Sequence, residues 1–435
     1  MVKAICFYLP QYHPVRENDE WWGEGFTEWR NVAKAVPNFP GHYQPHVPSE
    51  LGFYDLRLVE VQKKQAAMAK SYGIHGFCYY YYWFGGRRIL ERPLDQMVAH
   101  PEVDIPFCVC WANENWTRTW DGKEKDILLG QKHSPEDDEA FIRALLPMFR
   151  DPRYIRVNGA PMVLVYRADL FPDMKETAKR WRRIAKAEGF PELHLCAVQF
   201  YGITDPRPWG FDAAVEFPPH QFIGPENRPD TIPQFTNPRF SGAVVDYQKV
   251  VAQALQKPVP DYLVYRGVMP SWDNTARRQD TPHIFINSSP LDYQYWLRRM
   301  VKQTEQARPP EHQFVFINAW NEWGEGCHLE PDLKYGRAFL KATQAALEGS
   351  TSVDQVVDEL RVGGKYNDSA AQEIVEAFEA RERSLYALQE ELRRKNAQLS
   401  SQPPAPPPPT LTTVAKHQLN RYPKLKKVLK KMLRR

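Results

Sequence analysis

Two glutamates stand three residues apart in a loop whose composition suits carbohydrate chemistry. Glu322 and Glu325 follow the apolar run from Phe314 to Ile317, in the segment FVFINAWNEWGEGCHLEPD. Two carboxylates in one low-dielectric loop drive their pKa values apart, so that one holds a proton while the other is ionised. Cleavage of a glycosidic bond needs such a pair. We therefore predict catalytic roles for Glu322 and Glu325.

A plainer interpretation of this loop has both glutamates in water and the tryptophans plugging the end of a barrel. Two features favour the catalytic interpretation. The loop directly follows a run typical of a strand buried on both faces, and its acids are interleaved with Trp320 and Trp323. Active sites of (β/α)8 barrels lie in loops of this kind.

Eight short apolar runs predict the strands that position this loop. They are residues 4–9, 75–82, 107–111, 161–166, 193–200, 213–217, 263–269 and 314–318. Helical patterns separate most of them, most clearly at residues 54–72, 136–149 and 174–188. This alternation predicts an α/β protein with a (β/α)8 TIM-type barrel. A doubly wound open sheet is the competing architecture, but no G-x-G-x-x-G or P-loop motif opens a helix.

The aromatic and cysteine residues indicate which ligands the protein can bind. The 13 Trp and 21 Tyr exceed what a core needs and are typical of surfaces that stack on sugar rings. Five of the six cysteines fall in predicted strands, where we expect buried thiols, and no second close pair accompanies Cys108 and Cys110 to complete a zinc site. We therefore expect neither a metal nor a cofactor. The chain begins without a leader-like segment and holds no run of 18 apolar residues, which favours a cytoplasmic protein.

The composition changes after the predicted barrel of residues 1–348. Residues 349–400 predict a helical extension, either a short self-associating coiled coil or a single helix packed on the barrel. The Pro-rich residues 401–418 predict a stiff linker.

Residues 419–435 predict a basic amphipathic tail. The segment 416–435 has nine Lys or Arg and no acidic residue, whereas the formal net charge of the whole chain is only +4. Such a helix favours peripheral contact with the anionic inner membrane. A disordered tail or a nonspecific nucleic-acid patch are the alternatives, and we expect no specific nucleic-acid partner.

Five loop segments resemble the WbsX-like proteins of bacterial surface polysaccharide gene clusters and, through them, the glycoside hydrolase family 99 barrel of endo-α-mannosidases. The segments are YLPQYHP (8–14), GEGFTEW (23–29), YGIHGFCYYYYWF (72–84), CWANENWTRTWDG (110–122) and WNEWGEGCHLEPD (320–332). The resemblance spans roughly residues 1 to 345 and implies roles for individual residues. Glu322 becomes the base that takes the proton of a sugar 2-hydroxyl, and Glu325 becomes the acid/base at the leaving oxygen. The implied substrate-binding residues are Tyr12, Glu28, Trp29, Trp83, Asn113, Glu114, Trp116, Asn321 and Trp323.

The resemblance implies three functions. The first is glycosyl transfer in the assembly of an O-antigen or capsule-type polysaccharide, on an oligosaccharide or lipid-linked glycan. The second is retaining endo-hydrolysis of an α-linked glycan. The third is a non-catalytic glycan-binding scaffold.

Overall fold

The structure is a computed structural model that describes residues 2–118, 123–199, 202–348 and 395. The expected coiled coil, Pro-rich linker and basic tail lie outside the described residues. Within the described ranges, no helix combines the length and apolar character that a bilayer span requires.

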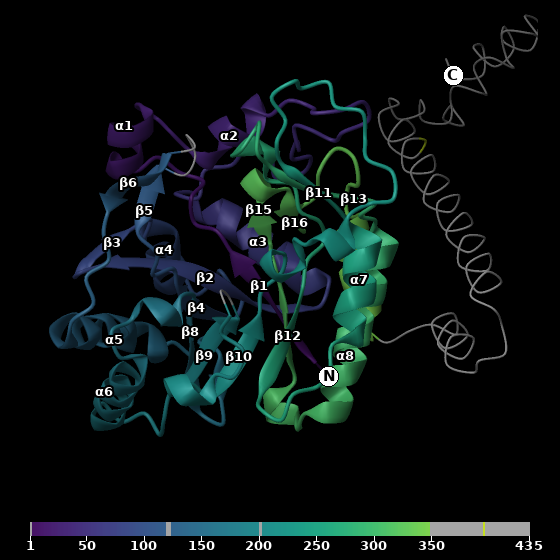
Figure 1. The fold of residues 1–435 in the computed structure, drawn as a ribbon. Helices are drawn as coiled ribbons and strands as arrows, with labels where there is room; N and C mark the ends of the chain where they lie inside the picture. Colours follow the sequence, from purple (N-terminus) through teal and green to yellow (C-terminus); the bar gives the residue numbers. More distant parts are fainter. Residues whose placement is uncertain (1, 119–122, 200–201, 349–394, 396–435) are drawn as a thin grey trace, which may run out of the picture. The chain divides into compact units, whose positions relative to one another are not determined.

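Eight parallel strands of the described chain close into a barrel (Figure 1), which confirms the predicted fold class. They are β1 (Lys3–Tyr8), β2 (Ile74–Phe84), β4 (Phe107–Trp111), β8 (Ala160–Val165), β9 (His194–Gln199), β10 (Ala213–Glu216), β12 (Val264–Val268) and β14 (Phe314–Ile317). Their order around the ring is β1-β14-β12-β10-β9-β8-β4-β2, and a β1–β2 pairing closes it. The ring forms because these strands carry apolar residues on both faces; β4, β8 and β14 are buried along their whole length.

Helices follow seven of the eight strands. In chain order they are α3 (Val59–Ser71), α4 (Arg92–Ala99), α5 (Pro135–Phe149), α6 (Met174–Ala187), α7 (Tyr247–Gln256), α8 (Pro290–Ala307) and α9 (Ala338–Glu348). The described residues between β9 and β10 hold only a short 3-10 helix, η3 (Arg207–Trp209). Serines cap two helices: Ser134 accepts a hydrogen bond from the Asp137 amide in α5, and Ser289 accepts one from the Asp292 amide in α8.

The first barrel helix begins later than its sequence pattern predicts. Residue 54 was the expected start, but α3 begins at Val59. Tyr54 instead lies buried in the preceding loop, where its carbonyl accepts a hydrogen bond from the indole of Trp29 at 2.7 Å. Tertiary contact therefore overrides the helical pattern at this end.

Additional elements gather near one end of the barrel (Figure 1). They are α1 (Arg16–Trp22), α2 (Glu28–Lys34), the hairpin of β5 (Trp116–Arg118) and β6 (Lys123–Leu129), the parallel pair of β11 (Ala243–Asp246) and β13 (His283–Ile286), and the short hairpin of β15 (Asn321–Glu322) and β16 (Cys327–His328). Two short strands, β3 (Arg87–Ile89) and β7 (Arg156–Val157), extend the main sheet. All six cysteines are buried and none forms a disulfide.

Candidate active site

The two glutamates lie on a tight turn at the carboxyl end of β14. Glu322 ends β15, and Glu325 ends the 3-10 turn η8 (Trp323–Glu325). The turn closes at Gly326, whose φ of 57° lies in the left-handed region that favours glycine. The chain then returns as β16, which pairs with β15. This hairpin holds both acids at the mouth of the barrel.

Asn321 fastens the hairpin to the end of β1. Its side-chain oxygen accepts the backbone N–H of Leu9 at 2.8 Å, and its amide nitrogen donates to the Leu9 carbonyl at 3.0 Å. The Trp320 amide also donates to the Phe7 carbonyl at 2.8 Å. Asn321 is fully buried, so it positions the neighbouring Glu322.

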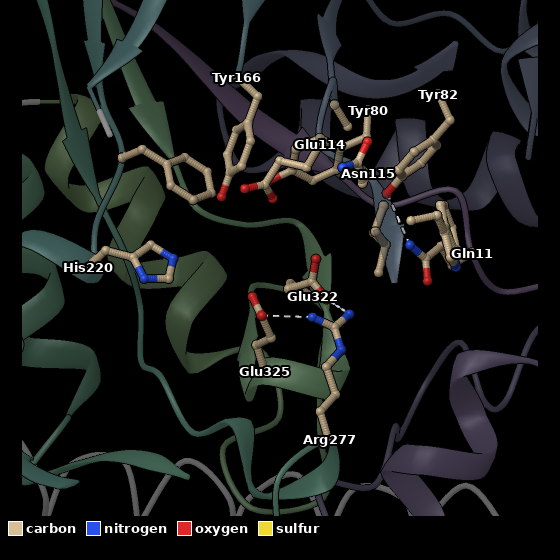
Figure 2. Close-up of a pocket in the computed structure, with 14 residues that line it drawn as sticks. Gln11, Tyr80, Tyr82, Glu114, Asn115, Tyr166, His220, Arg277, Glu322 and Glu325 are labelled. Carbon is tan, nitrogen blue, oxygen red and sulfur yellow. Dashed lines mark hydrogen bonds and ion pairs between the residues drawn. The ribbon is translucent and has the colours of Figure 1, made fainter. Parts of the chain in front are cut away.

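The guanidinium of Arg277 joins the two acids (Figure 2). Its Nη2 lies 2.6 Å from Oε1 of Glu322, and its Nη1 lies 2.7 Å from Oε1 of Glu325. The Arg277 side chain is 14% exposed, compared with 5% for Glu322 and 22% for Glu325. The more accessible carboxyl group therefore belongs to Glu325.

A third carboxylate completes the cluster. Nε of Arg277 lies 2.9 Å from Oε1 of Glu28, which begins α2 and is fully buried. Gly324 makes room for this contact, because a Cβ atom there would lie 2.2 Å from Oε1 of Glu28. One guanidinium is thus surrounded by Glu28, Glu322 and Glu325.

The cluster favours retention of a proton. Burial raises the pKa of Glu322 and of Glu325 above the ordinary value of a glutamate, and Arg277 opposes the shift. Three carboxylates outnumber the one guanidinium that bridges them, so a proton shared between Glu322 and Glu325 relieves their repulsion. Such a pair can act as a base and an acid near neutral pH.

A cavity of about 230 Å³ opens in front of the two acids. Its lining is mostly polar and aromatic: Leu9, Gln11, Tyr80, Tyr82, Ala112, Glu114, Asn115, Trp116, Tyr166, Phe217, His220, Arg277, Glu322 and Glu325. Figure 2 shows Glu114 and Tyr166 across the cavity from Glu322 and Glu325. Aromatic faces with scattered hydroxyl and carboxylate groups suit the alternating apolar and polar surfaces of a sugar.

The wall opposite the two acids is held by an ion pair. Nη1 of Arg167 lies 2.6 Å from Oε1 of Glu114, and Nη2 of Arg167 lies 2.7 Å from Asp169. The Glu114 carboxylate is 45% exposed and so is available to a hydroxyl in the cavity. Burial lowers the pKa of His220 to about 4, which leaves a neutral imidazole on this lining.

Among the substrate-binding residues implied by the sequence, Glu114 and Trp116 line this cavity and Glu28 contacts Arg277 behind it. The other six lie outside the lining. Asn113 exchanges two hydrogen bonds with the backbone of Arg167, and Asn321 holds Leu9 as described. These two side chains fix loops.

The remaining four are packed aromatics. The Tyr12 hydroxyl accepts the Trp323 amide at 3.0 Å, and the Tyr12 ring packs against Trp29. Trp323 stacks on His328 at 3.7 Å. Trp83 donates to Asp137 at 2.8 Å on the outer side of the barrel. Tyr12, Trp29 and Trp323 therefore support the hairpin from behind.

Sequence reasoning missed four prominent lining residues, namely Arg277, Tyr80, Tyr166 and His220. For Tyr80, which lies in β2, the sequence did contain a signal. Side chains alternate along β2, so Tyr80 and Tyr82 face the interior whereas Tyr81 and Trp83 face outward. Arg277 had no comparable signal, because its loop meets the hairpin only in the folded chain.

Comparisons with known proteins place the chain in a family. Residues 4–343 match the family described as "Glycosyltransferase WbsX". The uncharacterized protein WxcX of Xanthomonas campestris pv. campestris, found in two strains, is 48% identical over 349 residues, which cover 80% of this chain and 50% of WxcX. The chain thus spans about half the length of the curated relatives it matches.

One solved structure shares the architecture, and a second is less similar. A glycoside hydrolase-like protein has a TM-score of 0.50 at 14% identity, covering 80% of this chain and 94% of its own. The GH99 endo-α-mannosidase of Bacteroides thetaiotaomicron has a TM-score of 0.49 at 14% identity, covering 80% and 96%. At 14% identity, the similarity to the glycoside hydrolase-like protein concerns the fold alone. The family match shows that this chain belongs to the WbsX glycosyltransferase family.

Proposed function

We propose that this member of the WbsX family transfers a glycosyl group onto a growing bacterial surface polysaccharide, with Glu322 and Glu325 as the reacting acids. One observation carries the proposal: both carboxyl groups border the same cavity and contact one guanidinium, that of Arg277. An arginine that holds two carboxylates fixes their spacing and orientation before substrate arrives.

The roles follow the resemblance to glycoside hydrolase family 99. Glu322 takes the proton of the sugar 2-hydroxyl, whose oxygen attacks the anomeric carbon as the bond to the leaving oxygen breaks. Glu325 gives its proton to that leaving oxygen. An acceptor hydroxyl then opens the epoxide-like intermediate at the anomeric carbon and passes its proton to Glu325, while Glu322 returns the first proton to the 2-oxygen. The anomeric configuration is retained after two displacements.

The fate of the intermediate decides between transfer and hydrolysis. Tyr80, Tyr82 and Trp116 line the cavity and restrict the water that can reach the anomeric carbon when a glycan fills it. A sugar acceptor stacked on these rings competes with water for the same position. Retaining endo-hydrolysis is the second candidate, favoured by the two carboxyl groups beside one cavity, which is the equipment of a glycosidase.

The expected cytoplasmic placement and the basic tail of residues 419–435 favour a lipid-linked glycan as substrate, handled at the inner membrane. Analysis of the reaction products distinguishes transfer from hydrolysis. The full chain is incubated with candidate lipid-linked or nucleotide-activated donors, with and without acceptor. An acceptor-dependent, elongated product supports transfer. New reducing ends without an acceptor would favour hydrolysis.

Substitution of the acids separates catalysis from scaffolding. Glu322→Gln and Glu325→Gln keep side-chain shape and remove proton transfer, so each should lower turnover by about 10³-fold or more. Glu91→Gln, at an exposed glutamate, is the matched control. A fully active Glu322→Gln or Glu325→Gln variant would contradict the proposal and favour a non-catalytic, glycan-binding role.

A further inference from the structure

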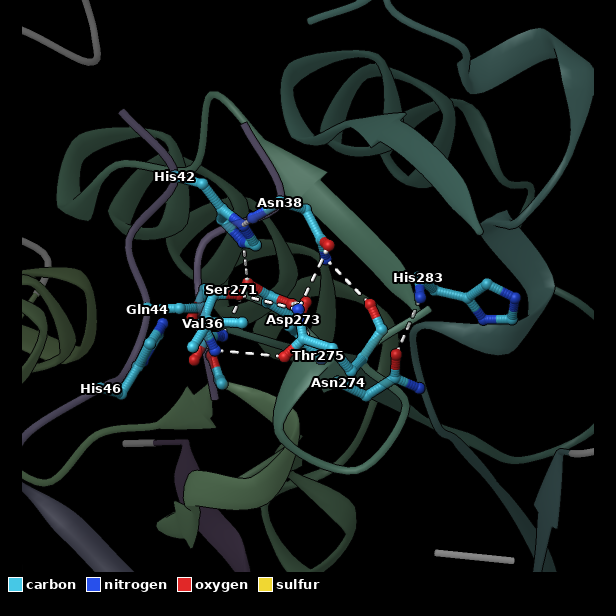
Figure 3. A network of polar contacts seen from close by, with 12 residues as sticks. Val36, Asn38, His42, Gln44, His46, Ser271, Asp273, Asn274, Thr275 and His283 are labelled. Carbon is cyan, nitrogen blue, oxygen red and sulfur yellow. Dashed lines mark hydrogen bonds and ion pairs between the residues drawn. The ribbon is translucent and has the colours of Figure 1, made fainter. Parts of the chain in front are cut away.

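A second cavity lies behind the catalytic hairpin. It measures about 250 Å³ and is bordered by the loop of residues 39–46, by β13 and by the hairpin residues Gly326 and His328. Figure 3 shows this region around Asp273, whose carboxylate contacts His42 at 2.6 Å and Gln44 at 2.8 Å. The backbone of Asp273 in turn donates to the Glu325 carbonyl at 2.7 Å. A change in this cavity therefore acts directly on the catalytic turn.

Three potential metal ligands meet in the wall of this cavity. Nδ1 of His46 lies 2.9 Å from Nε2 of His328, and Nε2 of His328 lies 3.9 Å from Oδ2 of Asp332. These three atoms all lie within 4.8 Å of one another, and the three residues are buried. No other group of three such ligands occurs in the part of the chain that the structure describes.

The tautomer of His328 suits metal binding. Nδ1 of His328 lies 2.9 Å from the Glu330 carbonyl oxygen, which can only accept. Nδ1 must therefore carry the hydrogen, and Nε2 presents its lone pair toward His46 and Asp332. A histidine whose second nitrogen donates to a backbone carbonyl is the usual arrangement for a metal ligand.

Asp332 supplies the carboxylate oxygen of this ligand group. One carboxylate oxygen accepts the Tyr335 amide at 2.5 Å, and the other faces His328. Among the described residues, His328 is the one basic side chain within ion-pair distance of the Asp332 carboxylate. The Lys334 ammonium lies over the rings of Tyr43 and Tyr335, 4.8 Å from each centroid, and is the competing cation.

We propose that His46, His328 and Asp332 bind a divalent transition metal of zinc-like preference. Two imidazoles and a carboxylate are a common ligand set for Zn²⁺, and the cavity leaves room for a water as the fourth ligand. With Zn–N distances of about 2.0–2.1 Å, two nitrogens on a tetrahedral ion lie roughly 3.3 Å apart. The observed 2.9 Å needs only a small outward movement of His46 or His328.

Such a metal would brace the hairpin that carries the acids. His328 pairs with Asn321 across β15 and β16, and its ring stacks on Trp323. His46 belongs to a loop 282 residues earlier. The ion therefore ties the catalytic turn to the loop that follows β1 and limits its movement. This inference does not depend on which glycan the enzyme uses.

Cobalt titration of the full chain tests the site. Untagged protein is dialysed against a chelator and titrated with Co²⁺, whose d–d absorption is strong only in tetrahedral or five-coordinate sites, and then with Zn²⁺ by calorimetry. We expect one equivalent of Co²⁺ with such absorption, its displacement by Zn²⁺, and a higher Tm for the metal-bound protein. Absence of both the spectrum and the calorimetric signal in the wild-type chain would overturn the proposal.

Variants then assign the ligands. His46→Ala and Asp332→Asn should each weaken Zn²⁺ binding by about 100-fold or more. His42→Ala is the matched control, since His42 borders the same cavity but lies outside the three-ligand group. Circular dichroism checks that each variant is folded. Equal Zn²⁺ affinity in wild type and folded His46→Ala would refute this ligand set.

Discussion

Arg277 and Glu322 form a buried ion pair 2.6 Å long between residues 45 positions apart in the chain. The same guanidinium also contacts Glu28 and Glu325. Burial and the charge of Glu28 raise the pKa of both proposed catalytic acids, and the charge of Arg277 lowers it.

Removal of the guanidinium should destabilise the protein and shift its pH profile. Arg277→Met leaves the buried Glu28 and Glu322 and the partly exposed Glu325 without their shared cation, which costs on the order of 3–5 kcal/mol for a broken buried pair. Loss of the positive charge raises the pKa of Glu322 and Glu325 further, since Arg277 lowers both. We expect the acidic limb of the kcat/KM profile to move to higher pH. Arg183→Met, which breaks an exposed ion pair with Glu139, should leave the profile unchanged.

Removal of the Glu28 carboxylate should shift the pH profile of kcat/KM in the opposite direction. The negative charge of Glu28 raises the pKa of both Glu322 and Glu325. Glu28→Gln therefore lowers both pKa values, and the acidic limb of kcat/KM should move to lower pH. Shifts of the same sign in Arg277→Met and Glu28→Gln would show that packing, and not charge, connects these residues to the reaction.

Gly324→Ala should disrupt the cluster without changing any charge. The added methyl group would lie 2.2 Å from Oε1 of Glu28 and 3.0 Å from Nε of Arg277. We expect a loss of about 1–3 kcal/mol in the free energy of unfolding and roughly 100-fold in kcat/KM, because the acids are displaced. Gly25→Ala is the control, since its φ of 73° brings backbone strain but its methyl group meets no atom within 4 Å. Equal kinetics in these two variants would contradict the steric explanation.

Glu330 should make stability fall as pH rises toward neutrality. Burial raises its pKa to about 7, against hydrogen bonds from Trp323, Gln65 and Tyr54. The folded protein therefore binds more protons than the unfolded chain between about pH 4.5 and pH 7, and its stability declines across that interval by roughly 3 kcal/mol.

Glu330→Gln imitates the protonated acid and should remove this component. Chemical denaturation of wild type and variant at pH 4.5 to 8 measures the difference in unfolding free energy. The wild type should lose stability relative to Glu330→Gln as pH rises, and the difference should level off above pH 7. Parallel curves for the two proteins would contradict the assignment.

Trp116 should bind substrate, whereas Trp83 should not. Trp116 borders the cavity and packs edge-on against Tyr82, so Trp116→Ala removes a stacking surface and should raise KM about tenfold, equivalent to about 1.4 kcal/mol. Trp83 donates to Asp137 outside the cavity. Trp83→Phe should lower thermal stability and leave KM unchanged. A larger KM effect from Trp83→Phe than from Trp116→Ala would refute the placement of the substrate.

The strands were predictable because each strand of a parallel barrel is buried on both faces and therefore consists of a short run of apolar residues. The predicted runs at residues 107–111 and 314–318 match β4 and β14 to within one residue. The placement of Glu322 and Glu325 followed from the same rule, since polar residues after a buried strand must lie at one end of the ring. The pair β11 and β13 escaped prediction, because it lies outside the eight-strand ring whose alternation with helices the sequence shows.

The partners of the acids were not predictable from spacing. Arg277 reaches the hairpin from the loop after β12, and His46 meets His328 across 282 residues. The cysteine argument against zinc considered neighbours in sequence, whereas these histidines are neighbours only in space. Trp29 and Trp323 were expected to bind substrate, but they pack against each other outside the cavity lining. A large ring at a barrel mouth can stabilise a loop as well as bind a sugar.

The ring order has a consequence for how activity arises during synthesis. Of the eight ring strands, β1 is synthesised before the others, yet it pairs with both β2 and β14, so one of its edges stays unpaired until residues 314–317 have been made. Asn321 then fastens itself to Leu9, and only this late docking brings Glu322 to its position. A nascent chain stalled before β14 therefore has no partial activity, because the earliest and latest parts of the barrel must meet before its chemistry exists.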